Sequence, residues 1–213
     1  MDLFGRLKAI LFSPKEEWQV IEAENPTQAE TIRYLSILIL ITSALFFFSF
    51  WTTWHPYFSM ISNSLLKTDY TRTATLVALG IVVLSTVLII FFTILCNYLA
   101  AIIINALSDQ FGASKDFNKV FSLLGYSSTP MCIVGILSLW TPLLFLSWLL
   151  GIYVIYLLYL GTKLLIKPDT GKQVGYVIMS IVVWMVSYGI ILKVIMVILS
   201  EMNASMFNSA FGH

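Results

Sequence analysis

Charged residues are what this sequence has least of, and they are scarcest where catalysis would need them. Only 11% of the 213 residues are charged, and the longest apolar stretches contain no Asp or Glu. The sequence also lacks a His-Glu-x-x-His metal motif, a glycine-rich phosphate loop and a Gly-x-Ser-x-Gly elbow. These absences argue against an enzyme, a metal site and a bound cofactor. The remaining enzymatic hypothesis needs His55 as the base for Ser127 or Ser128.

An excess of one charge and a disulfide framework are missing as well. The net charge of +1 at pH 7 excludes a strongly basic nucleic-acid-binding protein, so no nucleic acid is expected as a partner. Cys96 and Cys132 are the two cysteines, and both fall in apolar stretches. They are expected to be small packing residues. Proton pumps use carboxylates or histidines as relays within the membrane. The long apolar stretches contain neither, which argues against a proton pump.

Apolar residues are what the sequence has in excess. It is 59% hydrophobic, with a mean hydropathy of +0.89, which is too apolar for one soluble core of this size. Because about 20 helical residues cross a bilayer, the pattern predicts an all-α membrane protein with a bundle of five transmembrane helices. The expected spans are about 34–54, 74–107, 117–139, 143–166 and 174–199. Residues 1–33 form a cytoplasmic N-terminal segment, residues 34–200 the membrane domain, and residues 201–213 a short external tail.

The positive charges predict the orientation of these spans. Lys and Arg prefer the cytoplasmic side of a membrane. With the N-terminus inside, two of them, Lys67 and Arg72, lie in external segments, and nine lie in cytoplasmic segments: Arg6, Lys8, Lys15, Arg33, Lys115, Lys119, Lys163, Lys167 and Lys172. The N-terminus is therefore expected inside and the C-terminus outside.

The N-terminal segment has the pattern of two short amphipathic helices. The first has apolar residues on one face beside Arg6 and Lys8: Leu3, Phe4, Leu7, Ile10 and Leu11. It either lies in the lipid headgroup region or docks on the cytoplasmic ends of the spans. The second helix is expected to begin with Ser13 as N-cap, Pro14 at the first position and Glu16 in a capping box, and to end near Ala23. Its acidic residues are expected to face water: Glu16, Glu17, Glu22 and Glu24.

Three residues are candidate interface contacts. Leu7 and Trp18 project from the expected amphipathic helices toward a membrane surface or a protein partner. Lys193 lies near the outer end of the fifth span, where its long side chain reaches the headgroups.

Polar residues inside the expected spans form the candidate site. Pro130 removes a backbone donor and frees the carbonyl of Tyr126, so a kink or break is expected in the third span. Two readings remain open for the set: a polar path for a small solute or ion between the second, third and fourth spans, or hydrogen bonds that pack the helices. The set consists of Asn97, Asn105, Tyr126, Ser127, Ser128, Thr129, Pro130, Tyr153, Tyr156 and Tyr159.

Several segments, in this order and spacing, resemble the Yip (Ypt-interacting protein) domain family of integral membrane proteins, in particular its short bacterial members. The segments that carry the resemblance are Leu11 to Trp18 with Ile21 and Glu24, Ala106-Leu107, Phe111-Gly112, Lys115 to Phe117, Tyr126 to Pro130, Gly151 to Tyr153, Tyr156 to Gly161, Lys172, and Val174 to Tyr176.

The resemblance implies a five-span helical bundle with a cytoplasmic N-terminus, in a bacterial inner membrane. Eukaryotic relatives act in early secretory trafficking and associate with small GTPases and with each other. The residues and the resemblance together predict a non-enzymatic scaffold or adaptor. Its expected partners are membrane lipid and, at the cytoplasmic face, a protein partner or a second copy of the chain, with a small GTPase suggested by the resemblance alone. The alternative is a small-solute or ion channel or transporter.

Overall fold

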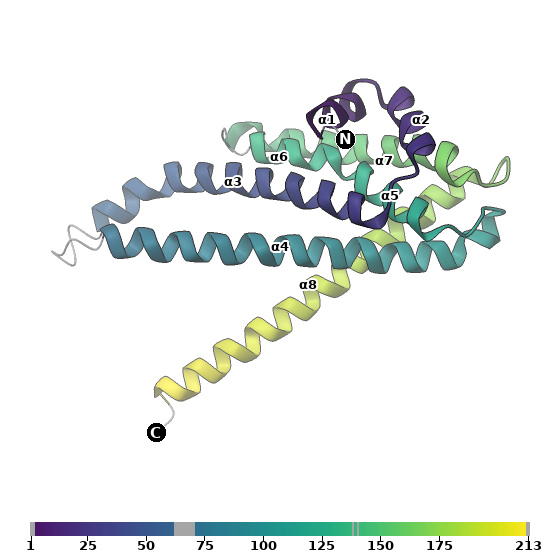
Figure 1. Ribbon diagram of the computed structural model, residues 1–213. Helices are drawn as coiled ribbons and strands as arrows, with labels where there is room; N and C mark the ends of the chain where they lie inside the picture. The colour runs from purple at the N-terminus through teal and green to yellow at the C-terminus, as the bar shows by residue number, and fades with distance from the viewer. Residues whose placement is uncertain (1–2, 62–70, 138, 140, 212–213) are drawn as a thin grey trace.

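The computed structural model describes residues 3–61, 71–137, 139 and 141–211, and every regular element among them is helical. Helices α3 and α4 lie side by side, and α8 crosses α4 and diverges from it toward the C-terminus (Figure 1). Helix α5 packs against both α3 and α4, α6 packs against α3, and α7 packs against α5 and α8. The α-helices are α1 Leu3–Phe12, α2 Pro14–Glu24, α3 Gln28–Ile61, α4 Thr71–Leu107, α5 Phe117–Ser127, α6 Cys132–Leu137, α7 Ser147–Gly161 and α8 Gln173–Phe211.

Four shorter helical elements join or extend these helices. Three are 3₁₀ turns and the last is a π-helical turn that continues α7: η2 Ser108–Phe111, η3 Thr129–Met131, η4 Thr141–Leu146 and η5 Thr162–Ile166.

Four stretches of the described residues are long and apolar enough to cross a bilayer. They contain 26, 30, 20 and 25 residues, and about 20 helical residues suffice. The stretches are Gln28–Thr53, Val82–Phe111, Ser147–Ile166 and Gln173–Val197. They correspond to the first, second, fourth and fifth of the expected spans. Helix α4 continues without a break through the whole of the second expected span.

The third expected span, 117–139, is not one continuous helix. Helix α5 stops at Ser127, η3 follows, and α6 has only 6 residues. At about 1.5 Å per residue, the 11 residues of α5 cover about 16 Å, about half of a hydrocarbon core. The break occurs at Pro130, because the proline cannot donate to the helical ladder.

The capping box forms at a different place from the one the sequence predicts. Helix α2 does begin at Pro14 after Ser13, but the Ser13 side chain makes no capping hydrogen bond. The reciprocal pair instead precedes α3. The Thr27 amide donates to Glu30 Oε2 at 2.8 Å, and the Glu30 amide donates to Thr27 Oγ1 at 3.3 Å. Helix α3 therefore starts at Gln28, before the expected position 34.

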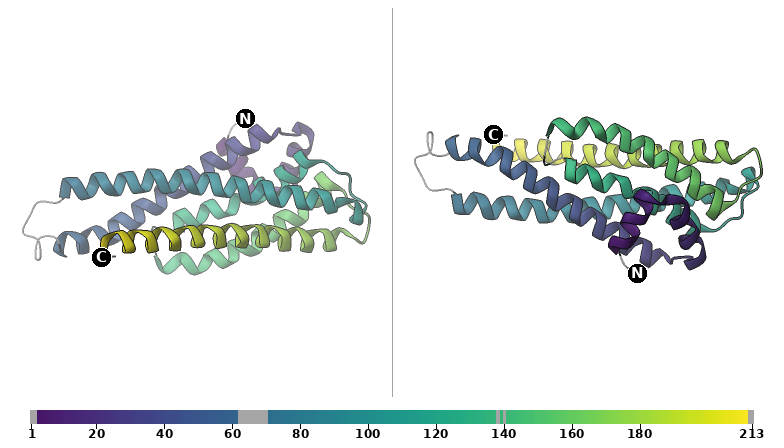
Figure 2. Two further views of the ribbon diagram at one scale, coloured as in Figure 1. Left: turned by 90° about the horizontal axis from the view of Figure 1, so that it is seen from below. Right: turned by 90° about the horizontal axis from the view of Figure 1, so that it is seen from above.

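The best-packed part of the molecule lies at one end of the bundle. There α2 lies beside the loops 112–116 and 167–172, opposite the ends of α3 and α4 at Ile61 and Thr71, and α1 lies nearer the middle of the bundle (Figures 1 and 2). The largest fully buried side chains belong to this core: Trp18, Phe121, Tyr126, Leu157 and Tyr176. Apolar side chains farther along the long helices are exposed, as expected for helices surrounded by lipid.

The two loops at this end touch each other. The Asp169 amide donates to the carbonyl of Phe111 at 3.0 Å. Gly112 has φ +69°, and a Cβ there would lie 2.1 Å from Cγ of Asp169. Only glycine fits both the left-handed conformation and this close approach. The end of the bundle at which α2 docks is therefore a packed layer.

Candidate functional site

The broken segment after α5 satisfies its own freed backbone groups through hydroxyl side chains. Thr129 Oγ1 donates to the Tyr126 carbonyl at 2.5 Å, and Ser128 Oγ donates to the Leu124 carbonyl at 2.9 Å. Tyr34 of α3 hydrogen-bonds to Thr129 across the interface at 2.8 Å. The break is thus a polar, hydrogen-bonded joint that packs against α3.

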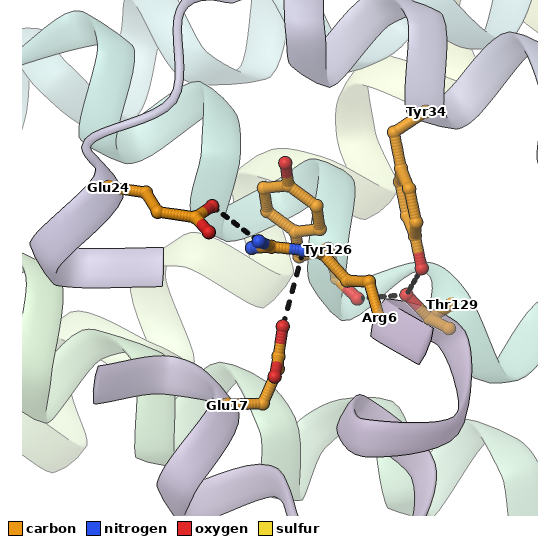
Figure 3. Close-up of polar contacts among 6 residues, drawn as sticks. All are labelled: Arg6, Glu17, Glu24, Tyr34, Tyr126 and Thr129. Carbon is orange, nitrogen blue, oxygen red and sulfur yellow. Dashed lines mark hydrogen bonds and ion pairs between the residues drawn. The ribbon is translucent and has the colours of Figure 1, made fainter. Parts of the chain in front are cut away.

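Tyr126 is the centre of this joint. Its side chain is fully buried, and its ring lies 4.8 Å from the ring of Tyr34, centroid to centroid. On the other side the guanidinium of Arg6 sits over the ring, with Cζ 5.5 Å from the centroid (Figure 3). A cation over a desolvated aromatic face contributes about 1–2 kcal/mol. The first helix of the chain therefore contacts the break in the membrane domain directly.

Arg6 is a buried charge held by two carboxylates of α2. Its side chain is 4% exposed, and Nε lies 3.2 Å from Oε1 of Glu17, which is also largely buried. Nη2 donates to Oε2 of Glu24 (Figure 3). Burial raises the pKa of the Glu17 carboxyl, the positive charge of Arg6 opposes this, and the Glu24 carboxylate adds to it. The expectation that all four acidic residues of this helix face water is wrong for Glu17, because it is the counter-ion of Arg6.

Two further contacts hold α1 and α2 on the bundle. The Tyr153 hydroxyl donates to the carbonyl of Leu11 at 2.8 Å. Trp18 is 1% exposed and packs against Gly161, where a Cβ would lie 2.8 Å from Trp18 Cζ2. Leu7 is half-buried against the same core. Of the two arrangements left open for α1, the structure has it docked, with Trp18 in the core rather than at a membrane surface.

The acidic residue Glu22 adds a peripheral ion pair to this junction. Lys167, just after η5, contacts Glu22 Oε1 through its Nζ. Both groups are partly exposed, so this pair contributes little to stability compared with the buried one.

The predicted polar set is divided between different places. Tyr126 and Thr129 lie where α1 contacts the broken segment, which we call the N-terminal junction. Ser127 is buried beside them with no partner for its Oγ among the described residues. Asn97 is buried on α4, where its Nδ2 donates to the Thr93 carbonyl at 2.8 Å and to the Tyr188 hydroxyl of α8 at 3.3 Å. Asn97 therefore pairs with the fifth expected span and not with the third or fourth.

The other predicted residues have unlike surroundings. Asn105 of α4 is half-buried, and its Oδ1 has no hydrogen-bond partner in the part of the chain that the structure describes. Tyr156 and Tyr159 are exposed on α7, although Tyr153 lies 5.7 Å from Tyr156, ring to ring. Lys193 is exposed on α8. The tyrosine repeat is thus not a continuous stripe facing other helices.

The serine–histidine pair of the enzymatic hypothesis is not assembled. Tyr34 contacts Thr129, and His55 lies 21 residues farther along the same helix. That spacing corresponds to about 31 Å. The side chain of His55 lies outside the described ones, but the helix places its backbone far from Ser127. In the described residues, no group of His, Cys, Asp and Glu is arranged to hold a metal ion.

Arg6 and Tyr34 are site residues that the sequence analysis did not single out. A signal for Arg6 exists: it shares a helical face with Leu3 and Ile10, at spacings of three and four residues. A charge on the buried face of an amphipathic helix calls for a buried counter-ion. Nothing local marks Tyr34, because its partners lie about 95 residues away in the chain.

Comparison with known proteins agrees with the arrangement of these helices in a membrane. The family model of the Yip1 domain matches residues 8–193, from α1 to α8. Neither the curated proteins nor the solved structures contain a match. Because the match covers far more than half of the chain and four of its helices are long and apolar enough to span a bilayer, this chain is an integral membrane protein of the Yip1 domain family.

Proposed function

We propose that the protein is a non-enzymatic membrane scaffold or adaptor that recruits its partner through the outer face of α1 and α2. The observation that carries the proposal is the two-faced character of α1. Its inner face is locked onto the bundle by Arg6, while Phe4 and Phe12 are 70% and 78% exposed on the outer face. Lys8 lies between them, four residues from each. We name the outer stripe Phe4, Lys8 and Phe12 the α1 outer stripe.

The α1 outer stripe combines aromatic anchors with positive charge, which suits a membrane surface or a protein partner of negative charge. Membership in the family makes a small GTPase a candidate for that partner. A second copy of the chain and anionic lipid headgroups are the other candidates. Because α1 and α2 are rigidly docked, the stripe has a fixed orientation relative to the bundle, as a recruiting surface requires.

We further propose that this surface is cytoplasmic, in a bacterial inner membrane. The segments rich in Lys and Arg support this orientation, since α1, α2 and the loops 112–116 and 167–172 lie in the same half of the bundle (Figure 2). The broken segment α5–η3–α6 would be the fifth crossing and would bring the C-terminus to the outer side. Broken helices cross membranes when neighbouring helices and hydroxyl groups satisfy the freed backbone groups, as Tyr34, Ser128 and Thr129 do.

Transport through a polar path is the alternative. It rests on the buried amide of Asn97, and it has less support, because Asn97 pairs with Tyr188 rather than with the residues of the third and fourth spans. Flux of ions and small metabolites into vesicles, compared between wild type and Asn97→Leu, tests it directly. Flux above empty vesicles that falls in the variant would favour transport over scaffolding.

The scaffold is tested by removing the α1 outer stripe without disturbing the docked face. In Phe4→Glu plus Phe12→Glu, both substitutions lie on exposed positions, so the bundle remains folded. We expect the proteins that cross-link to wild type in intact membranes to be lost from this variant. The matched control is Gln19→Glu plus Ala23→Glu, which adds the same charge at exposed positions of α2. Identical cross-linked partners in all three proteins would show that the stripe recruits nothing.

A further inference from the structure

A cavity lies among the long helices, and its lining begins at Leu35 and Ser128, next to the hydrogen-bonded pair Tyr34 and Thr129. Its volume is about 940 Å³, at the upper end of the range of about 300–1,000 Å³ for small-molecule sites. Helices α3, α4, α7 and α8 contribute its walls, together with the broken segment at Ser128, Met131 and Val134. It is therefore lined by four stretches that are long and apolar enough to cross the bilayer, together with the broken segment.

The wall of this cavity is almost entirely apolar. Among the described residues that line it, no side chain is charged. Three hydroxyls in the wall donate to carbonyls of their own helical turns, which leaves them little capacity for a ligand: Thr42 to Leu38 at 2.9 Å, Ser85 to Val82 at 3.0 Å and Ser128 to Leu124 at 2.9 Å. The other polar groups of the wall are uncharged and belong to Ser43, Thr86, Thr93, Trp184 and Tyr188. An ion would therefore lose its hydration here without a counter-charge to replace it.

The cavity opens sideways toward lipid. Trp148 of α7 and Met185 of α8 line it, yet they are 82% and 70% exposed. Both lie inside stretches that are long and apolar enough to cross the bilayer, Ser147–Ile166 and Gln173–Val197. The surface on which these side chains are exposed therefore faces hydrocarbon.

The position of the cavity along the membrane normal determines which part of a lipid can enter it. Trp184 lines it 11 residues after the start of α8 at Gln173. That spacing places Trp184 about 16 Å along the helix, near the middle of a hydrocarbon core of about 30 Å. Headgroups and ester groups lie at the bilayer surface, so only hydrocarbon is present at this depth.

We propose that this cavity holds a hydrocarbon chain of a bilayer phospholipid, which enters between the helices from the side. Water is a poor occupant, because a cavity water needs two to four polar partners. An empty space of this size would leave the wall without contacts on one side. A chain from the surrounding bilayer supplies these contacts at mid-membrane depth and needs no polar group from the wall.

Gly151 makes this inference testable. It lines the cavity, and a Cβ added there meets nothing within 4 Å. Gly151→Phe therefore fills the cavity without a clash at the point of attachment. Gly189 is the matched control, since a Cβ there also meets nothing within 4 Å, and this residue of α8 is exposed and not part of the lining.

The probe is a phosphatidylcholine that carries a diazirine near the end of one acyl chain, in vesicles that contain the whole protein. After irradiation, the cross-linked residues are mapped by mass spectrometry. We expect wild type to be labelled at the cavity residues Val154 and Trp184. This labelling should fall several-fold in Gly151→Phe and stay unchanged in Gly189→Phe. Labelling of the lipid-facing residue Val194 should be equal in all three proteins.

Two results would overturn the proposal. One is labelling of Val154 and Trp184 that is equally strong in Gly151→Phe and wild type. The other is absence of that labelling together with cross-links between two copies of the chain at cavity residues, which would make a helix of a second copy the occupant. If Gly151→Phe lowers the yield of folded protein, Gly151→Leu fills the same space with a smaller side chain, and the same comparison decides.

Discussion

At the residue scale, the docking of the N-terminal helices depends on one buried arginine. Arg6 brings together two carboxylates of α2 and the ring of Tyr126. Such a pair adds little or no net stability compared with well-packed apolar residues, yet loss of one partner leaves an uncompensated buried charge. The junction therefore determines where α1 sits on the bundle, and this placement orients the α1 outer stripe.

Arg6→Met tests this role. The substitution keeps much of the side-chain volume and leaves Glu17 buried without its cation. We expect the free energy of local opening of α1 and α2 to fall by up to about 3–5 kcal/mol, measured as faster amide hydrogen exchange in these helices. Lys8→Met is the control, because Lys8 is exposed and its loss should change the free energy by less than about 0.5 kcal/mol.

The double variant Arg6→Met plus Glu17→Leu separates charge from packing. It removes both buried charges, so much of the lost protection should return. If exchange in the double variant stays as fast as in Arg6→Met, the guanidinium acts through packing on Tyr126 rather than through the buried ion pair.

At the element scale, the break between α5 and α6 is the feature that local sequence predicts best. Pro130, Ser128 and Thr129 predicted the break from local chemistry, and the hydrogen bonds of Thr129 and Ser128 confirm the reason for it. The contact of Tyr34 with Thr129 was not predictable, because it requires α3 to lie against the break. Local sequence thus determines where the chain bends, and packing determines what the bend contacts.

The close packing of α2 on α7 gives a prediction at this scale. In Gly161→Ala the new Cβ would lie 2.5 Å from Leu123 Cδ1 and 2.8 Å from the Trp18 ring. We expect overpacking to lower stability by about 1–3 kcal/mol, seen as a lower thermal midpoint of the purified protein. Gly189→Ala has open space around it and should be neutral or stabilising, by up to about 1 kcal/mol from helix propensity. An equal change of the thermal midpoint in both variants would mean that the close contact of Gly161 with Trp18 does not contribute to stability.

At the scale of the whole molecule, the side of the bilayer on which α1 lies decides what the α1 outer stripe can reach, and the number of crossings decides where the C-terminus lies relative to it. Four continuous stretches of the described residues are long and apolar enough to cross the bilayer, and the broken segment would add the fifth. An even number of crossings would put both ends of the chain on one side, and an odd number on opposite sides.

Cysteine accessibility tests the crossing number. In a chain with Cys96 and Cys132 replaced by alanine, single cysteines are introduced as Lys8→Cys and Ser200→Cys, both at exposed positions. With five crossings, a membrane-impermeant maleimide added to intact cells labels residue 200 and leaves residue 8 unlabelled until the membrane is opened. Equal labelling of both positions before opening would exclude an odd number of crossings.

The sequence by itself determined the class of this protein. The long apolar stretches, the absence of acidic residues within them and the Ser-Ser-Thr-Pro break all follow from the cost of placing charge and unpaired backbone groups in hydrocarbon. Those free-energy costs act on each stretch separately, so the membrane class can be inferred from the sequence without knowing how the helices pack.

Only the tertiary structure decided which polar residues meet. Arg6 forms an ion pair with Glu17 and lies over the ring of Tyr126, Asn97 donates to the Tyr188 hydroxyl, and the Tyr153 hydroxyl donates to the carbonyl of Leu11. Most of these contacts join residues from helices distant in sequence, and the packing of apolar faces sets how those helices cross. Hydrophobic packing is non-directional, so a one-dimensional pattern shows that a helix has a buried face but does not show which helix covers it.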